Sequence, residues 1–263
     1  MKKRILSAVI AIFVIVCLSV SALAEEETPT EYNNMVSLLM EGETGTVLQH
    51  NGGYEKVAQG TLNKLMTVLL TAEEIESGGL SINDVVTVSS NANAQTGAVV
   101  WLMPGEEITI EELLKSVIIG NANDASVALA EIVGGNEEEF TGMMNARAFE
   151  LGMRNTVFKN PAGYDCAGQY STPYDMALLC RELLKHEFLY KIMNTWIDRV
   201  RGGQTEIVNE NRLVRTYEGV IGLKASHTEA SGYCLALAAE RNGKLYIAIV
   251  MGGSDEDLSL IHI

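Results

Sequence analysis

Residues 61–70 read Thr-Leu-Asn-Lys-Leu-Met-Thr-Val-Leu-Leu and predict the first long helix of the chain. Its apolar residues recur at helical spacing, and Gly78-Gly79 closes the pattern. Thr61 and Lys64 lie three residues apart, so they share one helix face. A hydroxyl beside an amine is a candidate nucleophile with its general base. Alternatively, Thr61 is only the helix N-cap, a position that threonine favours, and Lys64 is a solvated helix lysine.

Two hairpins are expected, one before this helix and one near the end of the chain. Residues 35–40 and 46–50 read as strands joined through Glu43-Thr44-Gly45. Residues 233–239 and 245–251 flank Arg241-Asn242-Gly243, which contains an Asn-Gly turn. A short strand-like patch also covers residues 85–88.

A helical block lies between the hairpins. Thr109 caps a helix that runs to about Ile119. Glu111 and Glu112 lie in its first turn, at the positive end of the helix dipole. The pattern breaks at residues 120–122 and resumes in three helices, over 124–133, 137–151 and 172–184. A hairpin, a helical block and a second hairpin predict an α+β fold, an antiparallel sheet packed with helices.

The first 24 residues read as an export signal. Three basic residues start the chain, residues 5–20 are almost continuously apolar, and Ala22-Leu23-Ala24 offers a small-x-small cleavage site. We expect cleavage after Ala24, with an uncleaved anchor as the alternative, and an acidic lead-in over residues 25–34. Removing the signal takes the net charge from −15 to −18. A chain this acidic lacks the excess of basic residues that nucleic-acid binding requires, and anionic lipid surfaces repel it.

One domain is expected over residues 35–257. Residues 258–263 resemble the translation of a transposon end used in sequencing libraries, so we expect a non-native tail and a C-terminal truncation near Asp257; a genuine short tail is the alternative. Cys166, Cys180 and Cys234 show no metal-ligand spacing, and no metal or cofactor is expected. Cys180 and Cys234 read as buried free thiols, although one disulfide of undetermined pairing remains open.

Two further polar segments accompany Thr61 and Lys64. They are Asn121-Ala122-Asn123-Asp124-Ala125 and Lys224-Ala225-Ser226-His227-Thr228. Taken alone, each of these asparagines fits a turn. Longer signatures surround these segments: Val127 to Glu131, Met144-Asn145, Leu151-Gly152-Met153, Asn155-Thr156, Phe158, Asn160-Pro161 with Gly163, Tyr170-Ser171-Thr172, Asp175-Met176-Ala177, Gly222-Leu223 and Gly232-Tyr233.

With these signatures the chain resembles the low-molecular-weight penicillin-binding proteins, the serine-type D-alanyl-D-alanine carboxypeptidases of peptidase family S11, from about Met35 to Gly253. The resemblance implies a β-lactamase/transpeptidase-like fold with the motifs S-x-x-K, S-x-N and K-T-G around one cleft. It also implies an acyl-enzyme mechanism on peptidoglycan stem peptides. In that mechanism Thr61 takes the nucleophile slot, Lys64 is the base, and the backbone N–H groups of Thr61 and His227 form the oxyanion hole.

All three motifs depart from the family pattern. Thr61 replaces a serine, and its β-branch restricts χ1 where attack geometry is strict. Asn121 replaces the second-motif serine and cannot relay a proton, whereas Asn123 keeps the substrate-facing amide. Ala225 lacks the hydroxyl that helps bind the substrate carboxylate beside Lys224. Ser226 replaces a glycine and cannot substitute for that hydroxyl, because adjacent strand residues point to opposite faces.

Two hypotheses about the function follow, one for an enzyme and one for a binding protein. The first is a slow carboxypeptidase or related amidase acting through Thr61. The second is a non-catalytic protein that keeps the fold to bind cell-wall peptides, and the clustered departures favour it. A β-lactamase-like hydrolase is a weaker third reading. Peptidoglycan stem peptides are the expected partner, with β-lactams as further ligands, and an extracytoplasmic location is expected. Membrane association would need an uncleaved signal or a missing C-terminal anchor.

Overall fold

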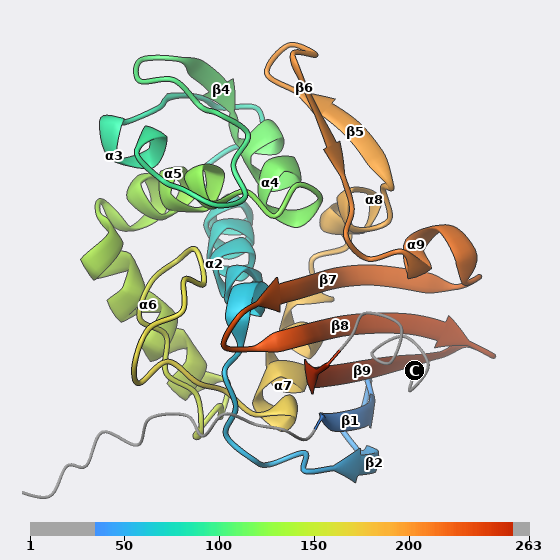
Figure 1. Ribbon diagram of the computed structural model, residues 1–263. Coiled ribbons are helices and arrows are strands. Elements are labelled where there is room, and N and C mark those ends of the chain that lie inside the picture. Colours follow the sequence, from blue (N-terminus) through green and yellow to red (C-terminus); the bar gives the residue numbers. More distant parts are fainter. Residues whose placement is uncertain (1–34, 255–263) are drawn as a thin grey trace, which may run out of the picture.

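The computed structural model describes residues 35–254, shown in colour in Figure 1. The predicted signal, the acidic lead-in and the C-terminal tail lie outside the described residues. A five-stranded antiparallel sheet lies on one side of the molecule and helices cover one of its faces (Figure 1). The expected α+β arrangement is therefore confirmed.

The two predicted hairpins join into this one sheet. The first is β1 (Val36–Glu41) with β2 (Val47–Asn51), and the second is β8 (Gly232–Arg241) with β9 (Lys244–Gly253). The strand order is β2-β1-β9-β8-β7, in which β7 (Val220–Thr228) forms an edge. The first and last parts of the described chain thus pair directly, with Val36 opposite Met251.

The turn between β8 and β9 explains why the second hairpin could be predicted from the sequence. Asn242 and Gly243 have φ values of +53° and +70°. Positive φ at both central residues defines the hairpin turn whose twist matches the flanking strands, and Asn-Gly adopts it readily. Arg241 pairs with Lys244 across the turn.

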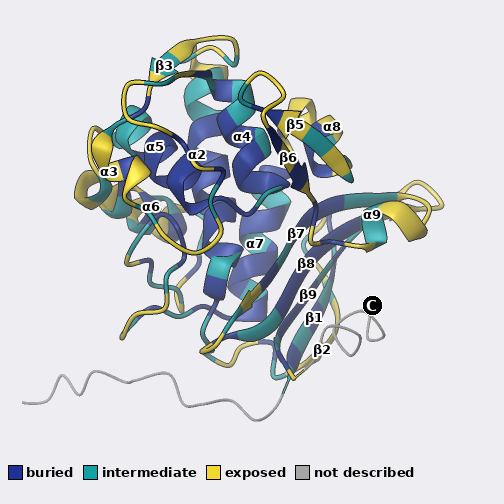
Figure 2. Ribbon diagram, turned by 45° about the horizontal axis from the view of Figure 1, so that its top comes forward, coloured by how far each residue is buried: buried dark blue, intermediate teal, exposed yellow. Residues whose placement is uncertain are grey.

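The helical block is built around α2 (Lys64–Ser77), which follows the short 3₁₀ helix η1 (Gly60–Asn63). Around it lie α4 (Ile110–Ile118), α5 (Asn123–Gly134), α6 (Glu137–Glu150) and α7 (Pro173–Leu183), and α7 packs on β1 and β9. Residues 64–72 of α2 are all buried (Figure 2). The first nine residues of α2 therefore lie in the molecular interior, whereas its end is exposed.

Local signals explain the predicted helix boundaries. The Thr109 side chain accepts a hydrogen bond from Glu112 N while Glu112 reaches back, a complete capping box at the start of α4. At the start of α7 the Thr172 side chain accepts a hydrogen bond from Asp175 N, and Pro173 lies in the first turn. Gly78, at φ +84°, ends α2. The predicted Thr109 cap and the predicted end of the first long helix at Gly78 are confirmed.

Several short elements complete the fold. They are β3 (Val85–Thr87), α3 (Ser90–Asn93), β4 (Glu107–Thr109), η2 (Glu187–Leu189), α8 (Tyr190–Met193), β5 (Ile197–Val200), β6 (Thr205–Val208) and α9 (Leu213–Thr216). The β5–β6 hairpin was not predicted, because each of its strands has only four residues. β7 begins at Val220, which pairs with Ala239.

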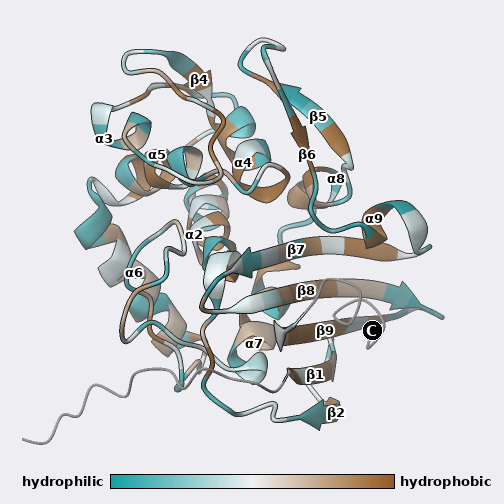
Figure 3. Cartoon of the chain, viewed as in Figure 1, coloured by the Kyte–Doolittle hydropathy of each residue, from teal (hydrophilic) through white to brown (hydrophobic). Residues whose placement is uncertain are grey.

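Hydropathy follows the layers. Apolar residues concentrate in the middle of β8 and β9 and in α2, α4 and α5 (Figure 3). Cys180 and Cys234 are buried as predicted, Cys166 is exposed, and all three are free thiols. Within residues 35–254, no helix is both long and apolar enough to cross a bilayer.

Candidate active site

The three polar segments meet where the helical block faces the edge strand β7. Thr61 lies in η1 and Lys64 begins α2, Asn121 and Asn123 flank the start of α5, and β7 carries the third segment. The turn η1 packs on β7, and α2 packs on α5. Residues separated by up to 165 positions in the sequence are thereby joined by hydrogen bonds.

Thr61 does not cap a helix. It lies inside the 3₁₀ turn, and α2 has Asn63 at its N-cap with no side-chain cap hydrogen bond. Instead, Thr61 donates two hydrogen bonds to Ser226 Oγ, from its backbone N at 2.8 Å and from its Oγ1 at 2.8 Å. The N-cap interpretation of Thr61 is therefore wrong, because the cap position comes two residues later.

Lys64 is fully buried, so it is not a solvated helix lysine. Its Nζ donates to Asn123 Oδ1 at 2.7 Å and to the carbonyl of Ala162. Burial, and then the positive charge of Lys224, lower the pKa of Lys64 well below its ordinary value. A lysine in this state can hold a neutral amine, the form that a general base needs.

A tight turn supplies the second partner of Lys64. Asn160 Oδ1 accepts hydrogen bonds from Gly163 N at 2.7 Å and from Tyr164 N at 2.9 Å, so the turn presents the Ala162 carbonyl to the lysine. Gly163 has φ +79°, and a Cβ there would lie 2.6 Å from the Gly60 carbonyl oxygen. Only glycine fits this close approach. The sequence marked Asn160, Pro161 and Gly163 as a signature without indicating this role.

The second segment is held by neighbouring backbone and by one carboxylate. Asn123 N donates to Ala98 O at 2.7 Å, and its Nδ2 donates to Thr96 O at 2.6 Å. Asn121 has a left-handed φ of +54°, and its Nδ2 donates to the two carboxylate oxygens of Glu210 at 3.2 and 3.3 Å. The buried Oδ1 of Asn121 finds no partner in the described part of the chain. Both polar atoms of the Asn123 side chain thus have a partner, whereas the Oδ1 of Asn121 has none among the described residues.

Asp124 fixes the loop beside this segment. Its buried carboxylate accepts hydrogen bonds from Val100 N at 3.1 Å and from Leu102 N at 3.0 Å. Between these two residues Trp101 has a φ of +59° and is 67% exposed. Strained backbone of this kind persists only where the surroundings enforce it, and the Asp124 carboxylate does so here. Sequence patterns did not single out Trp101.

In the third segment, Lys224 and Ser226 share one buried face of β7, as the alternation of a strand requires. Lys224 Nζ donates to Val117 O at 3.2 Å. Burial lowers the pKa of Lys224 to about 8, against the opposing effect of the Glu210 charge. Ala225 between them is half-buried, and His227 is exposed with its ring centroid 4.1 Å from that of Tyr233.

Glu210 is a site residue that sequence reasoning missed. It lies just after β6, the second strand of the hairpin that was not predicted, so nothing in the local pattern placed it near Asn121. Its carboxylate interacts electrostatically with both Lys64 and Lys224 and raises the pKa of each against the effect of burial. The site therefore contains two buried lysines and one exposed carboxylate.

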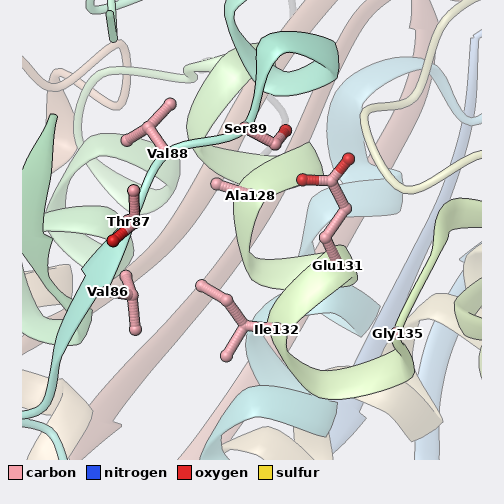
Figure 4. A pocket seen from close by; sticks show the side chains of 8 residues that line it. All are labelled: Val86, Thr87, Val88, Ser89, Ala128, Glu131, Ile132 and Gly135. Carbon is pink, nitrogen blue, oxygen red and sulfur yellow. The ribbon is translucent and has the colours of Figure 1, made fainter. Parts of the chain in front are cut away.

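A cavity of about 410 Å³ lies elsewhere, between the β3 region and the second half of α5. Figure 4 shows the side chains of Val88 and Ser89 on one wall and those of Ala128 and Glu131 on the other. None of the predicted site residues lines it. Among residues 35–254, no group of three or more His, Cys, Asp and Glu side chains is arranged to hold a metal ion.

Comparison with known proteins gives concordant matches. The family model described as D-alanyl-D-alanine carboxypeptidase, Peptidase_S11, matches residues 23–255. D-alanyl-D-alanine carboxypeptidase DacF of Bacillus subtilis is 38% identical over 259 residues, which cover 96% of this chain and 67% of DacF. DacC of Escherichia coli is 32% identical over 230 residues, covering 83% of this chain and 56% of DacC. The chain thus spans between about half and two thirds of these relatives.

A solved structure agrees with these matches. The D-alanyl-D-alanine carboxypeptidase DacD of Francisella tularensis superposes with a TM-score of 0.81 at 26% sequence identity, covering 90% of this chain and 68% of DacD.

Proposed function

The chain belongs to peptidase family S11, the D-alanyl-D-alanine carboxypeptidases, and we propose that its site binds the D-alanyl-D-alanine end of peptidoglycan stem peptides but hydrolyses it far more slowly than relatives with intact serine motifs. In this proposal Thr61 occupies the nucleophile slot and Lys64 the base slot. Asn123 and Lys224 contact the bound peptide, and the backbone N–H groups of Thr61 and His227 face the scissile carbonyl.

One observation carries the proposal. Thr61 Oγ1 donates its hydrogen bond to Ser226, whereas Lys64 Nζ donates to Asn123 and Ala162. A nucleophile is activated by a base within hydrogen-bond reach, and here the two groups are committed to different partners. Proton transfer from Thr61 to Lys64 therefore requires rearrangement before attack.

The other two motifs weaken later steps. Asn121 cannot relay a proton between Lys64 and a leaving group, and its amide is held by Glu210. Ala225 offers no hydroxyl to the terminal carboxylate, and a hydrogen bond to a charged group contributes about 1.5–3 kcal/mol. Glu210, which binds Asn121, also adds a negative charge that acts on Lys64 and Lys224. Peptide binding is retained through the remaining contacts, and turnover is not.

A working enzyme is the second candidate, and one observation favours it. Burial lowers the pKa of Lys64, so a neutral amine is available one helical turn from the hydroxyl of Thr61. If the ligand displaces Ser226, Thr61 becomes free to donate to that amine. This candidate predicts hydrolysis that depends on both Thr61 and Lys64.

D-alanine release separates the two candidates. We expect the unmodified protein to release D-alanine from a stem pentapeptide at least about 1000-fold more slowly than B. subtilis DacF, because one transition-state contact is typically worth 100- to 1000-fold and three are altered. Calorimetric titration of the same peptide should still show binding. Release within tenfold of DacF, abolished by Thr61→Ala, would establish the working enzyme instead.

We also propose that the protein acts outside the cytoplasm and that β-lactams enter the same site as ligands. Support comes from the basic start, the apolar run and the Ala22-Leu23-Ala24 site of the sequence, and from the family itself. Intact-mass analysis of secreted material is expected to show Glu25 as the first residue. Retention of Met1 in a membrane fraction would reject cleavage.

A further inference from the structure

The side chain of Ser226 lies where the family leaves a glycine, and it contacts Thr61 twice. Ser226 Oγ accepts hydrogen bonds from Thr61 N at 2.8 Å and from Thr61 Oγ1 at 2.8 Å, and the side chain is almost fully buried. Under the proposed function, Thr61 N–H is one of the two donors that would stabilise a developing oxyanion. That donor already has an acceptor within the protein.

We propose that Ser226 closes the oxyanion hole from within. Its hydroxyl oxygen takes the position at which the carbonyl oxygen of a bound peptide or β-lactam would accept the hydrogen bond of Thr61 N–H. This inference rests on the proposed function and identifies the residue that blocks the site. A ligand can polarise its carbonyl there only after displacing an oxygen that already satisfies the donor.

The backbone approach around Ser226 is close. Gly60, with φ +51°, precedes Thr61, and a Cβ on Gly60 would lie 2.9 Å from Ser226 Oγ and 2.4 Å from Ser231 Oγ. Ser231 is itself fixed by a 2.8 Å hydrogen bond from Thr228 Oγ1. The side chains of Ser226, on β7, and of Ser231, in the turn between β7 and β8, therefore lie close against η1, and that of Ser226 contacts Thr61.

One side chain thereby blocks two functions. The Ser226 oxygen satisfies the backbone donor of Thr61, and it also receives the hydroxyl proton of Thr61 that would otherwise be directed to Lys64. A glycine at position 226 has no side-chain oxygen and would release both groups. An alanine would release both hydrogen bonds and keep the Cβ, so the two variants separate hydrogen bonding from steric filling.

The first test measures acylation in a background where the other slots are restored. In the variant Thr61→Ser, Asn121→Ser, Ala225→Thr, the rate of acylation by benzylpenicillin is compared with Ser226 retained and with Ser226→Gly added. The glycine is expected to raise the rate about 100-fold or more, the effect of gaining one oxyanion donor. Equal rates in the pair, whether both fast or both undetectable, would overturn the inference.

The second test needs no catalysis. Amide hydrogen exchange of Thr61 is measured on threonine-labelled protein, with the unmodified chain compared with Ser226→Ala and the Thr61 signal assigned by its loss in Thr61→Ser. Removing the acceptor is expected to speed exchange at Thr61 at least about tenfold while other protected amides keep their rates. Unchanged exchange at Thr61 would show that Ser226 does not hold this N–H. Because D-alanine release plays no part, this test can fail while the proposed function stands.

Discussion

The variant Thr61→Ser, Asn121→Ser, Ala225→Thr, Ser226→Gly is expected to be acylated by benzylpenicillin at least about 1000-fold faster than the unmodified protein. Serine removes the methyl group that restricts χ1 at position 61, and the serine at position 121 restores a hydroxyl that can relay a proton. Threonine at position 225 restores a donor for the ligand carboxylate. Glycine at position 226 removes the acceptor now bound by Thr61.

The matched control is Thr61→Ser alone, for which we expect less than about a tenfold gain. Effects within one catalytic unit are strongly non-additive, so a restored nucleophile cannot act while the relay and the oxyanion donor remain lost. Time-resolved intact-mass spectrometry counts the covalent adduct, and thermal unfolding confirms that each variant folds. A gain from Thr61→Ser equal to that of the full set would show that the methyl group alone limits the protein.

Lys224→Met is expected to alter how stability depends on pH. Burial lowers the pKa of folded Lys224 to about 8 from the ordinary value of 10.5. Below pH 8 both states carry the proton, and between pH 8 and 10.5 the unfolded chain holds the proton that the folded protein releases. The free energy of unfolding therefore gains a contribution that rises with pH through this window.

Methionine removes that contribution. The stability of the unmodified protein relative to Lys224→Met should rise by about 3 kcal/mol between pH 8 and 10.5, at about 1.4 kcal/mol per pKa unit. Removing the Lys224 charge also removes one of the causes that lower the pKa of Lys64. The variant therefore loses part of the Lys64 contribution as well, and the difference in stability between the two proteins increases further with pH. Urea unfolding across the window measures the difference, with Lys191→Met, at an exposed site on α8, as the control. Parallel pH profiles for all three proteins would contradict the burial of a charged Lys224.

Much of the fold could be predicted because its signals are local. The Asn242-Gly243 turn, the Thr109–Glu112 capping box and Gly78 each act within a few residues, and the structure shows all three. The β5–β6 hairpin was missed because each of its strands has only four residues, although the Gly202-Gly203 pair between them, with φ values of +61° and +90°, is a turn signal. Glu210, which follows it, was missed for the same reason.

The site was predictable as a set of positions, but its contacts were not. Motif order and the surrounding signatures predicted that the segments of Thr61, Asn121 and Lys224 lie around one cleft. The pairing of Thr61 with Ser226 spans 165 residues, and that of Asn121 with Glu210 spans 89. Such contacts depend on how η1, the α4–α5 loop and β7 pack, which no local pattern encodes. The same limit explains why Thr61 was open to interpretation as a helix cap.

Incubating the unmodified protein with benzylpenicillin and following its intact mass tests the central claim most directly. Thr61, at the nucleophile position, donates to Ser226, and Lys64, at the base position, donates to Asn123. We therefore expect no adduct after hours, under conditions that fully acylate B. subtilis DacF. Rapid, stoichiometric addition of the penicilloyl mass, mapped to Thr61 and abolished by Thr61→Ala, would contradict it.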